Sequence, residues 1–215
     1  MRIPLVRIIA TVGSLTGVLA MTGCARSSVA ASTSGSELFE ACVPCHGAVG
    51  EGRTVLGAPA IAGLPAWYVA AQLERFQTGV RGRHADDPEG LRMQALSRQL
   101  RSEMETMAVA THVASLPQVT STAAIGGGDA AAGQRAYLVC ASCHGVTGRG
   151  FEAGKVPPLA GMDASYVAAQ VRKFKDGVRG TMPDDAFGPV MRAVAAPLSA
   201  EDIDQVAAYV HALSR

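Results

Sequence analysis

The apolar residues of the chain recur at helical spacing in several separate segments. In residues 65–79 and 163–177 they return at intervals near 3.6 positions, and each segment closes on a glycine, Gly79 or Gly177. No stretch shows a convincing alternation with period two. The pattern therefore predicts an all-α fold. The other segments that read as helices are residues 35–46, 101–116, 131–144 and 199–214.

The helical pattern occurs twice, because the second half of the chain repeats the first at an offset of 98 positions. The clearest matches are Cys42 with Cys140, Cys45 with Cys143, and His46 with His144. Two copies of this length predict tandem domains rather than a solenoid. The offset also relates Pro59 to Pro157, Tyr68 to Tyr166, Gln72 to Gln170, Phe76 to Phe174, Arg81 to Arg179, Met93 to Met191 and Leu100 to Leu198.

The repeat sets the expected domain boundaries. One domain is predicted over residues 35–116 and the other over 130–215. The segment between them, 117–129, is rich in Gly, Ala, Ser and Thr and is typical of a flexible linker. A similar small-residue stretch at 25–34 is predicted to be a tether.

The first residues are typical of an export signal. Arg2 and Arg7 precede an apolar run at 8–21 that is short for a membrane span, and the run leads into "MTGC". Small residues before Cys24 resemble a lipobox, so residues 1–24 are predicted to be a signal peptide ending in a lipidated cysteine. The alternative is cleavage after residues 28–30, which would discard Cys24; both interpretations export the protein.

Composition narrows the range of functions. The formal net charge is +1 and no block of Lys or Arg is present, so the sequence does not indicate a nucleic-acid partner. Aromatic residues make up only 5% of the chain. Domains of under about 100 residues bury a modest share of their surface and usually need a staple, a metal or a cofactor. Each half is therefore expected to contain one.

The two C-x-x-C-H motifs supply the candidate chemistry. A structural zinc site needs a second ligand pair nearby, and a thioredoxin-like pair needs a βαβ setting; neither accounts for the histidine. Covalent haem attachment accounts for all three residues, because two thiols add to the vinyl groups and the next residue ligates the iron. We therefore expect two haem c groups. Their attachment residues are Cys42, Cys45, Cys140 and Cys143, and their iron ligands are His46 and His144.

The sixth iron ligand is predicted to be methionine. Met93 and Met191 are a methionine pair that the repeat places in register, downstream of each haem motif. They could instead be core residues, and the main rival is the switched pair His84 and Met182. With both axial positions filled, the iron is closed to oxygen and peroxide, and electron transfer is the remaining chemistry.

On these motifs the sequence resembles the class I c-type cytochromes, in particular the di-haem cytochrome c4 family. The resemblance implies two tandem domains, each a few helices wrapped around one covalent haem. It further implies that the carbonyls of Pro59 and Pro157 accept a hydrogen bond from the proximal imidazoles. The family also crosses the first and last helices of each domain at a glycine and an aromatic residue. Here the matching residues are Gly35 with Phe39, and Gly133 with Tyr137 and Tyr209, whereas the first domain offers only Thr111 or His112 as the last partner.

Four further residues are candidate contacts of the haem propionates. Tyr68, Arg81, Tyr166 and Arg179 could donate hydrogen bonds to these carboxylates, which would otherwise be acidic groups near an apolar interior. The alternative for the two arginines is a solvated charge on a loop.

The function expected from the resemblance is a di-haem electron carrier that is not an enzyme. It would lie in the periplasm, tethered to the membrane through Cys24. Its donor would be a quinol-oxidising complex or a dehydrogenase, and its acceptor a terminal oxidase. One alternative is a haem subunit of a dehydrogenase complex, such as a flavocytochrome sulfide dehydrogenase. A di-haem peroxidase would need an open iron site and a longer chain.

Overall fold

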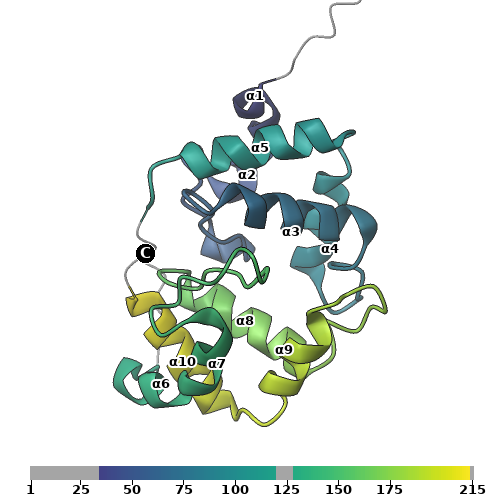
Figure 1. Ribbon diagram of the computed structural model, residues 1–215. Coiled ribbons are helices and arrows are strands. Elements are labelled where there is room, and N and C mark those ends of the chain that lie inside the picture. Colours follow the sequence, from purple (N-terminus) through teal and green to yellow (C-terminus); the bar gives the residue numbers. More distant parts are fainter. Residues whose placement is uncertain (1–33, 120–127, 214–215) are drawn as a thin grey trace, which may run out of the picture. The chain divides into compact units, whose positions relative to one another are not determined.

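The computed structural model describes residues 34–119 and 128–213, called here the first and second half. The predicted signal segment, Cys24, the tether up to residue 33 and most of the linker lie outside the described residues. The first half contains α1 (Gly35–Phe39), α2 (Val43–His46), the 3-10 turn η1 (Thr54–Leu56), α3 (Ala66–Thr78), α4 (Pro88–Ser97) and α5 (Glu103–Ser115). The second half contains α6 (Ala130–Ala136), α7 (Leu138–His144), α8 (Ala164–Lys175), α9 (Gly188–Ala195) and α10 (Ala200–Ala212) (Figure 1).

The all-α prediction is confirmed for the described residues, which contain isolated bridges but no strand. Helix α3 ends where the pattern predicts, with Gly79 in the left-handed region at φ 78°. Helix α8 ends at Lys175, two residues before the predicted Gly177. Helices α4 and α9 were not among the segments predicted to be helical. Their start signal is a proline in the first turn, which helices tolerate at that position.

In each half the first helix crosses the last helix at a glycine. A β-carbon on Gly35 would overlap the Ala108 carbonyl oxygen of α5, and one on Gly133 would overlap the Gln205 carbonyl oxygen of α10. Any larger residue would force these helices apart.

Aromatic rings accompany both crossings. Tyr137 packs against Tyr209 with ring centroids 5.2 Å apart, as expected for the second half. In the first half His112 takes this place, and its ring centroid lies 5.2 Å from that of Phe39. Of the two candidates Thr111 and His112, the histidine makes the contact.

The hydrophobic core of the second half includes residues of the first. Tyr137, Val167, Ile203 and other buried residues of the second half form one cluster with Leu64 and Tyr68 of the first half. A smaller cluster in the first half contains Phe39, Leu73, Val109 and Val113. The two halves thus share a core and belong to one compact unit.

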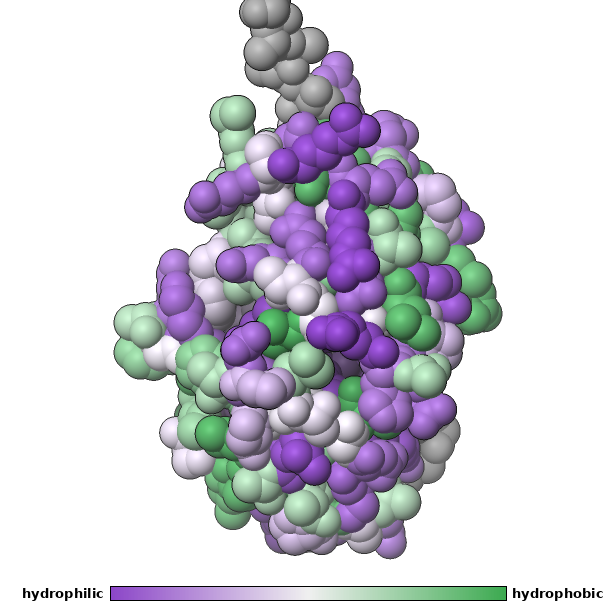
Figure 2. All heavy atoms as spheres, turned by 90° about the vertical axis from the view of Figure 1, so that its right-hand side faces the viewer, coloured by the Kyte–Doolittle hydropathy of each residue, from purple (hydrophilic) through white to green (hydrophobic). Residues whose placement is uncertain are grey.

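Hydrophobic and hydrophilic residues are intermingled on the face shown in Figure 2. Large apolar side chains that are exposed include Val55, Leu138, Val146 and Phe151. Among the described residues, no helix has the length and apolar character needed to cross a membrane.

Candidate functional site

Each C-x-x-C-H motif lies on a single helical turn. Cys42 is the N-cap of α2, and its carbonyl accepts a hydrogen bond from the His46 amide at 2.9 Å. Helix α2 stops directly after this histidine, because Gly47 adopts φ 83°. Helix α7 ends in the same way at His144 and Gly145. The helical turn therefore brings both thiols and the imidazole of each motif together.

Both histidines are held in one defined tautomer. Nδ1 of His46 lies 2.9 Å from the Pro59 carbonyl oxygen, and Nδ1 of His144 lies 2.9 Å from that of Pro157. Because a carbonyl can only accept, Nδ1 must carry the proton, which leaves the lone pair on Nε2. Both side chains are buried, and burial lowers the pKa of each imidazole while the bond to proline opposes that effect. A neutral imidazole with a free Nε2 is the form that binds iron.

The four cysteines of the two motifs do not form disulfides with each other. Burial, followed by the neighbouring Cys45, raises the pKa of the Cys42 thiol to about 11, and burial also raises the pKa of Cys140. Within the described part of the chain, no group of three or more His, Cys, Asp or Glu side chains could hold a metal ion, which disfavours a structural zinc site. The motifs lie on helices, and the described residues contain no strand that could provide a βαβ setting for a redox pair.

A cavity joins the first motif to a predicted methionine ligand. Cys45, His46 and Met93 line it, and the cavity is partly open to solvent. Apolar side chains of α3 complete much of the wall: Tyr68, Val69, Leu73 and Phe76. An apolar cavity that offers one free imidazole nitrogen, one thioether and an attachment thiol fits a haem with His and Met ligands.

The candidate sixth ligands differ in whether they line this cavity. Met93 of α4 lines the cavity and is half-buried, and Met191 takes the equivalent position on α9. Met162 of the second half also lines this cavity, although it lies in the shared core. The rival His84 is not among the lining residues; its side chain is 43% exposed and its Nδ1 accepts a hydrogen bond from the Asp86 amide at 3.2 Å.

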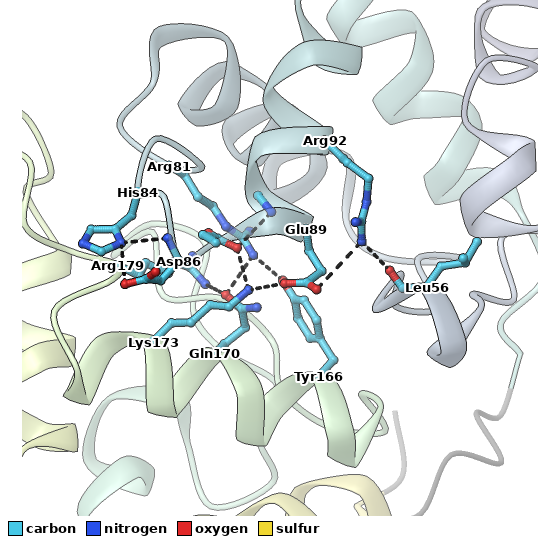
Figure 3. A network of polar contacts seen from close by, with 12 residues as sticks. Leu56, Arg81, His84, Asp86, Glu89, Arg92, Tyr166, Gln170, Lys173 and Arg179 are labelled. Atoms are coloured by element: carbon cyan, nitrogen blue, oxygen red, sulfur yellow. Dashed lines mark hydrogen bonds and ion pairs between the residues drawn. The ribbon is translucent and has the colours of Figure 1, made fainter.

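A polar cluster connects the two halves beside this cavity (Figure 3). Arg81 donates to Gln72 Oε1 at 2.8 Å, and across to the Tyr166 hydroxyl at 2.7 Å and Gln170 Oε1 at 3.0 Å. Arg179 donates to Gln170 Oε1 at 2.8 Å. We call these five residues the interface cluster. Arg81 is only 7% exposed, so the alternative of a solvated loop charge is wrong for this residue.

The interface cluster holds buried positive charge and an unused donor. Burial, followed by the nearby Arg81, lowers the pKa of Arg179 to about 10. For Tyr68, which lies near the cluster, burial followed by the charge of Tyr166 raises the pKa to about 12. The Nε of Arg81 is buried and has no hydrogen-bond partner among the described residues. Such a site fits a carboxylate, and haem carries two of them as propionates.

Three ion pairs that join described residues of the two halves were missed from the sequence. Arg75 Nη1 lies 2.6 Å from Asp185 Oδ1, and Lys173 Nζ lies 2.5 Å from Asp87 Oδ1. Lys173 also lies 2.8 Å from Glu89 Oε2. The signal was present in the repeat, since the two cations are 98 positions apart, as are the two aspartates.

Comparison with known proteins identifies the family. The cytochrome c family model matches residues 32–117 and again 130–214. The chain is 35% identical over 180 residues to the thiosulfate dehydrogenase electron acceptor of Stutzerimonas stutzeri, covering 79% of this chain and 77% of that protein. It is 30% identical over 210 residues to cytochrome c4 of Pseudomonas aeruginosa, covering 93% and 96%. These names describe electron carriers, so the flavocytochrome-subunit alternative is not favoured.

Solved structures give the same result. Cytochrome c4 of Pseudomonas stutzeri superposes with a TM-score of 0.65 at 27% identity, covering 84% of this chain and 97% of that one. A thiosulfate dehydrogenase of Marichromatium purpuratum superposes with a TM-score of 0.68 at 32% identity over 83% of this chain, which spans 39% of that longer chain. The chain therefore belongs to the cytochrome c family as a tandem member of the cytochrome c4 type, which carries two covalent haem c groups and transfers electrons.

Proposed function

We propose that each half holds its haem through its own motif and one methionine. Cys42 and Cys45 would hold the first haem through thioethers, and His46 and Met93 would ligate its iron. The observation that carries this assignment is the cavity that His46 and Met93 line together, with the imidazole Nε2 free. The second haem has the equivalent set at 98 positions further on: Cys140, Cys143, His144 and Met191.

The bound haem supplies a one-electron iron couple, whose potential a thioether ligand raises. The residues of the chain set its environment. The carbonyls of Pro59 and Pro157 fix the orientation of the two imidazoles, and the apolar side chains of α3 form much of the wall of the first site. Two protein ligands on each iron leave no position for a substrate, so we propose a carrier and not an enzyme.

We further propose that the interface cluster receives haem propionates. Tyr68 and Arg81 line the cavity beside the first motif, and Tyr166 of the second half lines it as well. Arg179 adds a second cation to the cluster. The buried Arg81 Nε supports this assignment because it needs an acceptor.

The proposed partners are redox proteins outside the cytoplasm. The donor is a dehydrogenase that oxidises thiosulfate, because one relative carries the name of an electron acceptor for such an enzyme. The acceptor is a terminal oxidase. The domains are proposed as 35–116 and 130–215 with a linker at 117–129, behind a signal peptide at 1–24 that leaves Cys24 as a lipid anchor and 25–34 as a tether.

Two experiments test this function. Mass spectrometry of the mature protein should find two covalent haems per chain and an acylated Cys24; one haem or none would overturn the assignment. In stopped-flow mixing, a purified thiosulfate dehydrogenase with thiosulfate should reduce both haems, and thiosulfate alone should reduce neither. Failure of the complete mixture to reduce the protein would contradict the proposed donor while leaving the haem assignment intact.

A further inference from the structure

The peptide group between Pro59 and Ala60 is hydrogen-bonded at both ends. Its carbonyl accepts from Nδ1 of His46 at 2.9 Å, and its N–H donates to Oδ2 of Asp163 at 2.7 Å. Asp163 belongs to the second half and is 2% exposed. A continuous path of hydrogen bonds thus leads from a buried carboxyl group of one half to the imidazole of the other.

The side chain of Asp163 accepts this hydrogen bond from Ala60 and does not cap its own helix, α8. The residue occupies the N-cap position of α8, where aspartate usually accepts a hydrogen bond from the first turn. Here its side chain makes no capping bond. The distance of 2.7 Å to the Ala60 nitrogen is typical of a hydrogen bond to a charged acceptor.

The second half cannot build the same path. Nδ1 of His144 bonds the Pro157 carbonyl at 2.9 Å, which matches the first half. The next residue is Pro158, however, and proline has no N–H to donate. The residue equivalent to Asp163 in the first half is Pro65, which has no carboxyl group. The two histidines therefore share their first hydrogen bond but differ in the second.

We infer that Asp163 is a positioning residue that lowers the reduction potential of the first haem. This inference rests on the proposed ligation by His46. Hydrogen bonds in a chain polarise one another, so a carboxyl oxygen on the N–H makes the Pro59 carbonyl a stronger acceptor for His46. A stronger bond to Nδ1–H makes the imidazole a better donor to ferric iron, which stabilises the oxidised state. The first haem has this hydrogen-bond path through Ala60 and Asp163. The second haem lacks it, because the equivalent residues are Pro158 and Pro65, so the two haems should differ in reduction potential.

The test measures both potentials in the two-haem protein by spectroelectrochemical titration. Asp163→Asn preserves the shape and an acceptor oxygen but removes the charge. One of the two midpoint potentials should rise and the other should stay unchanged. In NMR spectra of the reduced protein, the Nδ1–H resonance of His46 should move upfield while that of His144 does not. A purely structural role would leave the His46 resonance and both potentials in place.

Two further variants complete the design. Ala60→Pro removes the N–H and introduces the residue that the second half has at this repeat position, Pro158. It should raise the same potential, and the double variant with Asp163→Asn should give no more than the larger single shift. Pro158→Ala restores an N–H in the second half, where the residue equivalent to Asp163 is Pro65 and has no carboxyl group. It should leave both potentials at their wild-type values.

The outcomes are distinguishable. If Asp163→Asn carries two haems and moves neither potential, or moves both equally, the inference is wrong. If it fails to take up two haems, Ala60→Pro decides by the same readouts. If the wild-type spectra show no histidine ligation of the first haem, the proposed ligand set fails, and the inference fails with it.

Discussion

Nζ of Lys173 lies 2.5 Å from Oδ1 of Asp87, and this contact ties the second half to the start of α4. The same Asp87 oxygen accepts the Gly90 N–H at 2.9 Å and so caps the helix that carries Met93. Arg75 and Asp185 make the equivalent link in the other direction, and Asp185 accepts from the Gly188 N–H at the start of α9. Each half therefore fixes the start of the other half's methionine helix.

Lys173→Met is expected to lower the free energy of unfolding. Lys173 and Asp87 have side-chain exposures of 14% and 4%, and removing one partner of a buried pair leaves an uncompensated charge, at a cost of about 3 kcal/mol. Chemical denaturation of the two-haem protein measures the change. The matched control is Arg172→Met on the same helix, whose 2.6 Å pair with Asp204 is more exposed and should cost under about 1 kcal/mol. Equal losses in both variants would contradict a special role for the pair between the halves.

Acid should destabilise the protein through the same carboxylates. Burial alone would raise the pKa of Asp87, but the Lys173 ammonium and the Gly90 N–H hold it below its ordinary value. Burial would likewise raise the pKa of Asp185, but the Arg75 guanidinium and two backbone N–H groups lower it. A depressed folded pKa gives stability that is present above the unfolded value of about 3.9 and is lost as the pH falls through the folded value.

Thermal melting as a function of pH tests this dependence. The wild-type melting temperature should fall steeply below about pH 4. Asp87→Asn should be less stable at neutral pH and should show a shallower decline in acid, because one of the titrating groups is gone. A variant curve parallel to the wild-type curve would show that Asp87 does not contribute to the acid transition.

Replacement of the axial methionines should be visible in the far-red band of ferric haem that reports sulfur ligation. Met93→Ala should remove half of the band and Met191→Ala the other half, since each ligates one haem of two. Met162→Ala is the matched control, because Met162 lines the same cavity as Met93 but should leave the band intact. Loss of the band in the Met162 variant would reassign the ligand of the first haem.

Gly133→Ala should destabilise the second half by roughly 2 kcal/mol, because the new methyl group would meet the Gln205 carbonyl and push α6 from α10. The measurement is the unfolding free energy of the haem-loaded protein. Gln134→Ala, an exposed change at the next position, should stay within about 0.5 kcal/mol of wild type. If both variants match wild type, the helices cross with more room than the structure shows.

The sequence alone predicts the features that depend on residues close together in the chain, namely the haem-attachment motifs and the longer helices. The C-x-x-C-H motif is a local chemical unit, so its spacing suffices to name the attachment residues and His46. Helices α3 and α5 are long enough for their apolar period to be recognised, whereas α4 and α9 have only 10 and 8 residues and follow loops. Their pattern was too short to separate a helix from a loop.

The contacts between the halves could not be predicted in the same way. Asp163 and Ala60 are 103 positions apart, and no periodicity indicates that they meet. The repeat does make Arg75 and Lys173 equivalent, as it does Asp87 and Asp185, but it says nothing about which copy each residue bonds. The structure adds this information, and it changes the assignment of Arg81 from a possible loop charge to a buried interface residue.

Leu64 and Tyr68 of the first half fill part of the core of the second half, so the two halves cannot be separated without loss. Deleting the first half would remove these two side chains and leave the core of the second half incomplete. The second half therefore depends on the first for part of its interior, and when expressed on its own it would expose an apolar surface where Leu64 and Tyr68 pack.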